Sequence, residues 1–155
     1  MHNNEVLLRI TEAAALDVDR IVAIFALGGA PLDEAAALAI LSGPSTGPEK
    51  VCTDDLLLRF LDGFIVEQRG QPPARSGGSA PRPEPLTNNV VLKKLRIALQ
   101  LKEDDVLGLL DAGGTPLSNR QLGALARKWG NKHYRVCSDE VLASFLAGLL
   151  RARGA

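Results

Sequence analysis

The chain has 155 residues, of which 18 are basic and 18 acidic, so its net charge of zero points to no class of partner. Two cysteines and two histidines are too few for a disulfide-rich scaffold or a full set of zinc cysteines. No apolar run approaches the ~20 residues that cross a bilayer, and the N-terminus does not have the pattern of a signal peptide. We therefore expect a cytoplasmic protein without membrane contact, metal or cofactor.

An internal repeat organises the sequence. Residues 1–70 align without a gap on residues 86–155, an offset of 85, and 19 of the 70 aligned positions are identical. The shared positions include Asn3-Asn4 with Asn88-Asn89, Gly28-Gly29 with Gly113-Gly114, and Val51-Cys52 with Val136-Cys137. Two copies are too few for a solenoid, so the repeat predicts two similar units related by a pseudo-twofold axis.

The first copy, residues 1–70, reads as four helices. Residues 6–14 carry an apolar stripe of helical period after an expected cap at Asn4, and residues 21–25 carry a second stripe that Gly28-Gly29 ends. An Ala-rich third helix is cut short by Gly43-Pro44. A fourth begins after the cap Thr53, and its stripe runs over residues 56–65.

Residues 71–85 separate the copies. This segment holds five prolines, two glycines and two serines, and little that a core would bury. Proline excludes a helix interior and a central strand, so we expect a flexible, partly polyproline-like linker.

The second copy, residues 86–155, repeats the four helices. Asn89 is the expected first cap, Ser118 and Gln121 have the spacing of a capping box, and Ser138 is the last cap. Gly148 repeats Gly63 in mid-helix, where glycine is unfavourable, so both positions predict a close helix crossing. No segment alternates with a period of two, and we predict an all-α fold of two homologous four-helix units.

Units of about 70 residues bury too little surface to be stable alone, so each copy needs a neighbour. Val90, Ile97 and Leu101 form a second apolar stripe on the back of the first helix of the second copy. Burial beneath the other copy is the simplest interpretation. The alternative is an interface with another protein or a second copy of the chain.

The duplicated segments NNVVLKKLRIALQLKEDDV and YRVCSDEVLASFLAGL, with the Gly-Gly turn between them, resemble the YehS-like bacterial family of duplicated domains of unknown function. The resemblance covers both copies and not the linker. It implies a small bacterial protein built from two related helical units, and it implies no catalytic residue. The copies differ most where GPSTGPEK, residues 43–50, replaces KWGNKHYR.

The cysteines and histidines give little support for catalysis. Cys52 and Cys137 precede the caps of the fourth helices, where an apolar residue packs on the first turn, so we expect buried free thiols. His133 lies four residues before Cys137, but metal binding needs further ligands and a Cys–His nucleophile needs a third orienting group. We predict no metal site, no catalytic residue and no enzymatic activity.

Charge differs strongly between the copies. Residues 1–70 carry five basic and eleven acidic side chains, whereas residues 86–155 carry eleven basic and six acidic ones. Cations beside aromatic residues are typical of nucleic-acid contacts, and the second and third helices of this copy resemble a helix-turn-helix in outline. The candidate nucleic-acid-binding residues are Lys93, Lys94, Arg127, Lys128, Lys132, His133, Tyr134 and Arg135, with Trp129 among them in the sequence.

Three interpretations of these charges remain open. The basic residues bind nucleic acid, or they dock an acidic protein, or they form a solvated face that matches the acidic copy. We predict a non-enzymatic interaction module that binds nucleic acid through the basic face. A protein–protein adaptor or homo-oligomer that uses the stripe of Val90, Ile97 and Leu101 is the alternative.

Overall fold

A computed structural model describes residues 2–42, 52–70, 86–127 and 131–154. The predicted linker 71–85, the segment 43–51, and Lys128 and Trp129 lie outside the described residues. The helices of the described part are α1 (Asn3–Ala13), α2 (Val18–Leu27), α3 (Glu34–Ser42), α4 (Asp54–Arg69), α5 (Asn88–Leu99), α6 (Glu103–Ala112), α7 (Asn119–Leu125) and α8 (Asp139–Gly154).

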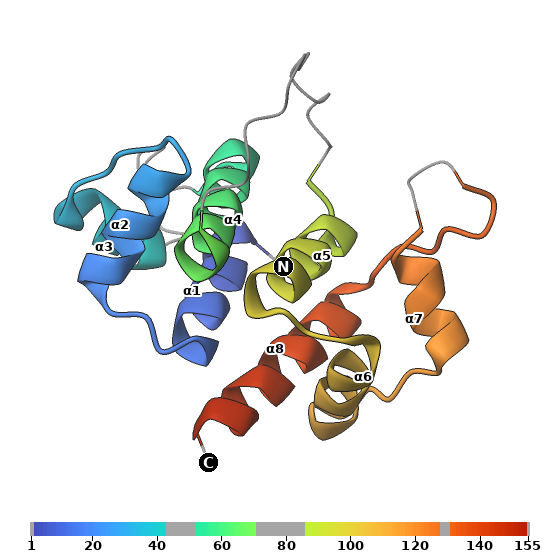
Figure 1. Cartoon of the computed structure of the whole chain (residues 1–155). Helices are drawn as coiled ribbons and strands as arrows, with labels where there is room; N and C mark the ends of the chain where they lie inside the picture. Colours follow the sequence, from blue (N-terminus) through green and yellow to red (C-terminus); the bar gives the residue numbers. More distant parts are fainter. Residues whose placement is uncertain (1, 43–51, 71–85, 128–130, 155) are drawn as a thin grey trace.

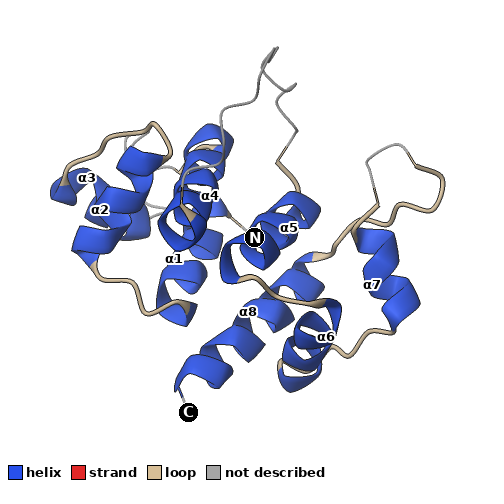
Figure 2. Cartoon of the chain, in the orientation of Figure 1, coloured by secondary structure: helices blue, strands red, loops and turns tan. Residues whose placement is uncertain are grey.

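The described residues form helices and loops without a strand, as the sequence predicts (Figure 2). α1–α4 form the first copy and α5–α8 the second, and each helix of the second copy starts 85 residues after its counterpart. None of the helices in the described ranges is both long enough and apolar enough to cross a membrane.

Most of the predicted helix starts are confirmed. The Thr53 hydroxyl accepts a hydrogen bond from the backbone N–H of Leu56 at 3.1 Å, and Ser118 and Gln121 form the reciprocal capping box. The caps expected at Asn4 and Asn89 are wrong, because both residues lie inside the first turn of α1 and α5. Their side chains point instead to other elements of the same copy.

Glycine allows two helices to cross backbone to backbone in each copy. A Cβ added at Gly63 of α4 would overlap the carbonyl of Ile24 in α2, and one at Gly28 would overlap the carbonyl of Arg59. Gly148 and Gly113 have the same relation to α6 and α8. The close crossing predicted from the mid-helix glycines is therefore present in both copies.

The two copies pack through exchanged contacts. α4 lies against α5, and α1 lies against α8, so the first helix of each copy covers the fourth helix of the other (Figure 1). Lys94 of α5 pairs with Asp62 of α4, and Arg69 of α4 donates to the carbonyl of Ile97 at 3.4 Å. Buried side chains of both copies form one continuous core, as their small size requires.

Candidate functional site

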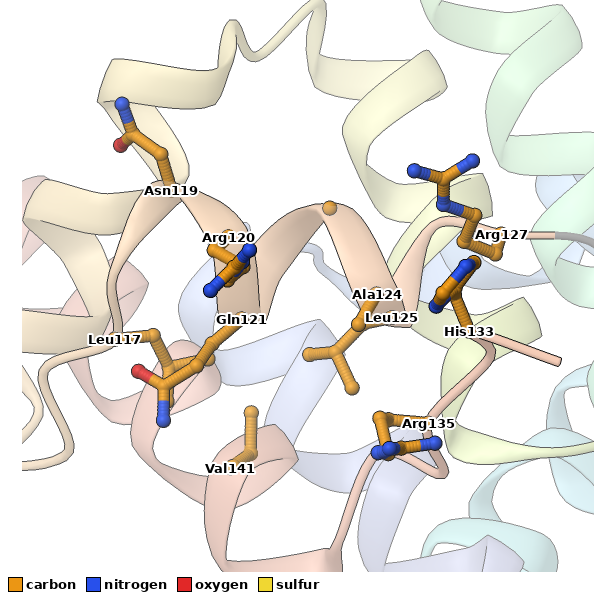
Figure 3. A pocket seen from close by; sticks show the side chains of 11 residues that line it. Leu117, Asn119, Arg120, Gln121, Ala124, Leu125, Arg127, His133, Arg135 and Val141 are labelled. Atoms are coloured by element: carbon orange, nitrogen blue, oxygen red, sulfur yellow. The ribbon is translucent and has the colours of Figure 1, made fainter.

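A groove of about 890 Å³ lies along α7 in the second copy, between this helix, the loop of residues 131–136 and the start of α8 (Figure 3). We call it the α7 groove. Its walls carry the cationic side chains of Arg120, Arg127 and Arg135 and the imidazole of His133. The remaining lining residues are Leu117, Asn119, Gln121, Gly123, Ala124, Leu125 and Val141.

The side chain of Asn89 holds both walls of the α7 groove in position through hydrogen bonds. Its side-chain N–H groups donate to the carbonyl of Leu125, at the end of α7, at 3.0 Å and to the carbonyl of Arg135, in the loop, at 2.8 Å. Its Oδ1 accepts from the backbone N–H of Cys137 at 2.8 Å. One buried side chain therefore holds α7, the loop and the start of α8 in a fixed relation.

A backbone hydrogen bond reinforces this arrangement. The N–H of Arg135 donates to the carbonyl of Ala124 at 3.1 Å, which ties the loop directly to α7. The side chains of Arg120, Arg127, His133 and Arg135 are all exposed above this framework. A rigid backbone with exposed cations is suited to an anionic ligand, because the ligand does not have to order the site.

The arginines of the α7 groove, Arg120, Arg127 and Arg135, form no ion pair with the acidic residues that the structure describes. In the first copy, by contrast, Arg9 pairs with Glu5 and Arg20 pairs with Glu67. The positive potential of the α7 groove is therefore available to a ligand.

The structure brings together only part of the predicted basic face. Arg127, His133 and Arg135 line the α7 groove, whereas Lys132 and Tyr134 lie on the same loop but do not line it. Lys128 lies outside the described residues.

Lys93 and Lys94 are carried by α5, away from the groove lining, and Lys94 is occupied by Asp62. These two lysines form a second basic group among the candidate nucleic-acid-binding residues and are not part of the groove lining, so their role stays a prediction. Sequence spacing groups all of these cations in one copy, but only the tertiary contacts decide which of them converge.

Arg120 joins the site without having been predicted. It is the second residue of α7, on the exposed first turn that follows the Ser118 capping box. The capping box and the position of Arg120 two residues later were visible in the sequence. They predict a cation at the solvent-facing start of a short helix.

The apolar stripe of α5 faces the first copy. Lys94 and the carbonyl of Ile97 both contact α4, so the side of α5 that carries positions 90, 94, 97 and 101 is turned toward α4. Val90 is buried and Leu101 is half-buried, while Ile97 keeps 37% of its surface exposed. Burial between the copies accounts for most of the stripe, and its use by a separate partner stays a prediction.

Both cysteines are buried free thiols, as predicted. Burial raises the pKa of Cys52 to about 12 and that of Cys137 to about 11, and the nearby Asp54 and Asp139 add to the shift. Thiols held in the protonated form are poor nucleophiles and poor metal ligands. Among the described residues, no three acidic, histidine or cysteine side chains gather as metal ligands would.

The first copy repeats only part of the cationic lining of the α7 groove. Ala35 and Ser42 of α3 correspond to Arg120 of α7 and to Arg127, which follows α7, while Lys50 corresponds to Arg135 and lies outside the described residues. Two of the contacts of Asn89 do recur, because Asn4 donates to the carbonyl of Ile40 at 2.6 Å and accepts from the N–H of Cys52 at 3.1 Å. The contacts of this asparagine with the third helix and the start of the fourth are thus shared, whereas Arg120 and Arg127 are particular to the second copy.

Comparison with known proteins identifies relatives of undetermined function. The family described as "Protein of unknown function (DUF1456)" matches residues 3–70 and again residues 88–154. The "Uncharacterized protein YehS" of Escherichia coli (strain K12) is 35% identical over 153 residues, which cover 96% of this chain and 94% of the relative. No solved structure is significantly similar to the chain. The family matches both copies, and the relative matches almost the whole chain. The chain is therefore a member of the DUF1456 family.

Proposed function

We propose that this protein binds nucleic acid through the α7 groove, as a non-enzymatic module. The observation that carries the proposal is the convergence of Arg120, Arg127 and Arg135 on one groove, none of them paired with a carboxylate of the described residues. Arginine donates in a planar fork that matches phosphate oxygens. His133 adds a further donor on the same wall.

The uneven distribution of charge supports the same function. The first copy has a net charge of −6 and the second of +5, from the five basic and eleven acidic residues of one and the eleven basic and six acidic residues of the other. A polyanion that approaches the molecule is therefore drawn to the second copy and repelled from the first. Such steering orients the ligand before contact and raises the association rate at low salt.

A titration of fluorescently labelled nucleic acid, followed by anisotropy at several salt concentrations, tests the proposal. If three or four phosphates are neutralised, log K falls with log salt at a slope of roughly −2 to −4. Arg120→Gln should weaken binding several-fold and reduce the slope by about 1. Arg120 is exposed, so the variant is expected to fold normally.

Arg9→Gln is the matched control. It removes the same charge from an exposed arginine of the first copy, whose ion pair with Glu5 contributes little to stability. Binding should be unchanged in this variant. Absence of binding at low salt, binding that salt does not affect, or equal losses in Arg9→Gln and Arg120→Gln would reject the α7 groove as a nucleic-acid site.

A further inference from the structure

We infer that the ligand of the α7 groove is a single-stranded nucleic acid. Its bases lie against the apolar lining residues, which we call the floor, and its phosphates lie on the basic lining residues, which we call the rim: Arg120, Arg127, His133 and Arg135. The inference rests on the proposed function and makes it narrower. Four features of the described residues support it: the apolar floor, the geometry of α7, the occupied amide of Gln121, and the flat side chains of the rim.

The floor of the groove is apolar. Leu117, Leu125 and Val141 line it, and Figure 3 shows Leu125 at the end of α7 above Val141 on α8, with Arg135 level with Val141. Leu117 and Val141 remain half-exposed, so the floor offers apolar surface to a ligand. A duplex has its bases stacked inside and presents mainly phosphate and sugar, whereas the unstacked bases of a single strand have faces that such a floor buries.

α7 is poorly arranged to read a duplex. It has seven residues, and at 1.5 Å per residue this is about 10 Å of helix. The connection from α6, residues 113–118, is longer than the three- or four-residue turn of a helix-turn-helix. The loop of residues 131–136 forms the opposite wall of the groove, so the lining surrounds a hollow beside α7 (Figure 3).

One of the two side-chain amides that line the groove, that of Gln121, is already occupied. Recognition of adenine in the major groove uses both the oxygen and the nitrogen of a glutamine or asparagine amide. The Oε1 of Gln121 accepts a hydrogen bond from the backbone N–H of Ser118 at 2.8 Å, as part of the capping box. Gln121 therefore cannot make the two-point contact without breaking the cap of α7.

The rim supplies flat groups on which bases can stack. Arg120, Arg127 and His133 line the groove, while the half-buried Tyr134 does not. Guanidinium and imidazole planes stack on the exposed bases of single strands in the same way as aromatic rings do. Stacking on the bases is accordingly assigned to these three side chains and not to Tyr134, a predicted nucleic-acid-binding residue.

The test uses the full-length protein and one labelled strand of about 12 nucleotides, a length within the site size of single-strand binders. Its affinity is measured alone and after annealing to its complement, at the same salt concentration. The single strand should bind at least about tenfold more tightly than the duplex. Equal or tighter binding of the duplex would overturn the inference and leave the proposed function standing, whereas binding of neither would reject both.

Val141→Thr tests the floor, because it exchanges a methyl group for a hydroxyl without changing charge. It should weaken single-strand binding a few-fold and leave the salt slope unaltered, in contrast to Arg120→Gln. Val22→Thr, at a half-buried valine of the first copy, is the control that should not change binding. Unchanged affinity in Val141→Thr would contradict a role for the floor.

Polyglutamate distinguishes an acidic protein from a nucleic acid as the ligand. The labelled strand is titrated with polyglutamate of matched charge, which has no bases to stack. Weak competition is expected, because charge alone does not occupy the floor. Competition as strong as that of the unlabelled strand would overturn the inference in favour of an acidic peptide ligand.

Discussion

The side chain of Asn89 and the backbone N–H of Cys137 form a buried hydrogen bond of 2.8 Å across 48 residues of sequence. The same bond joins Asn4 to Cys52 in the first copy, at 3.1 Å. Each asparagine also holds the last residues of the third helix, through Leu125 or Ile40. One side chain per copy thus connects the first helix, the third helix and the start of the fourth.

Asn89→Ala should lower the free energy of unfolding by about 2–4 kcal/mol, because it leaves a buried N–H and two carbonyls without a partner. Urea denaturation measures the loss. Asn88→Ala is the comparison, since its side chain is half-buried and bonds to the carbonyl of Cys137 and to the exposed Asp139. That variant should lose about 1 kcal/mol, and equal losses in the two variants would show that the buried network has no special weight.

Gly148→Ala should destabilise the protein by about 1–3 kcal/mol, even though alanine is the better helix former, because the new methyl group meets the backbone of Leu109. Gly108→Ala has the opposite expected sign. Its position in α6 is open, so the change should stabilise by about 0.5–1 kcal/mol. Thermal unfolding followed by circular dichroism compares the two, and a stable Gly148→Ala protein would contradict the close crossing.

Unfolding should be a single cooperative transition, because α1 packs on α8 and α4 packs on α5. Gly63→Ala, in the first copy, should lower the unfolding midpoint that is followed by the fluorescence of Trp129, the single tryptophan, which belongs to the second copy. The midpoint that is followed by circular dichroism should fall by the same amount. If the tryptophan signal kept its original midpoint, the copies would be independent folding units.

Alkaline pH should weaken the fold through the two buried thiols. Each thiol has a pKa above its ordinary value of 9.0, about 12 for Cys52 and about 11 for Cys137, because burial disfavours the thiolate. The unfolded chain therefore releases these protons first, and the stability that is complete below pH 9 falls as the pH rises toward 11 and 12.

Urea midpoints at pH 8 and pH 10 measure this effect. Between them the free energy of unfolding of the wild type should fall by about 2–3 kcal/mol more than that of a Cys52→Ala/Cys137→Ala double variant, since one pH unit is worth about 1.4 kcal/mol per proton and two thiols are involved. The comparison of slopes cancels the contributions of tyrosine and lysine, which both proteins share. Identical pH dependence in the two proteins would contradict the raised pKa of the thiols.

Local signals in the sequence predicted much of the fold. The repeat is found by aligning the chain with itself. The capping box at Ser118 and the mid-helix Gly63 and Gly148 are each recognised from a few neighbouring residues. Each feature has the predicted role in the structure. Asn4 and Asn89 were misassigned as caps because an asparagine near a helix start has the same local pattern whether it bonds locally or to a distant segment. The sequence does not record which of the two partners lies within reach.

The candidate site was less predictable for the same reason. Arg127, His133 and Arg135 are neighbours in sequence and remain neighbours in space. Lys94 was placed with them because of its charge, but Asp62 of the other copy pairs with it. Arg120 was missed because fifteen residues separate it from Arg135, and only the return of the loop onto α7 brings both to one groove.

The exchanged helix contacts have a consequence for the order of events during translation. α1 is synthesised before the other described helices, yet the surface that it covers belongs to α8, which follows all of them. The side of α1 that packs on α8 therefore stays uncovered until α8 has been synthesised. A translation product that ends before α8 would expose apolar helix faces to proteases and chaperones.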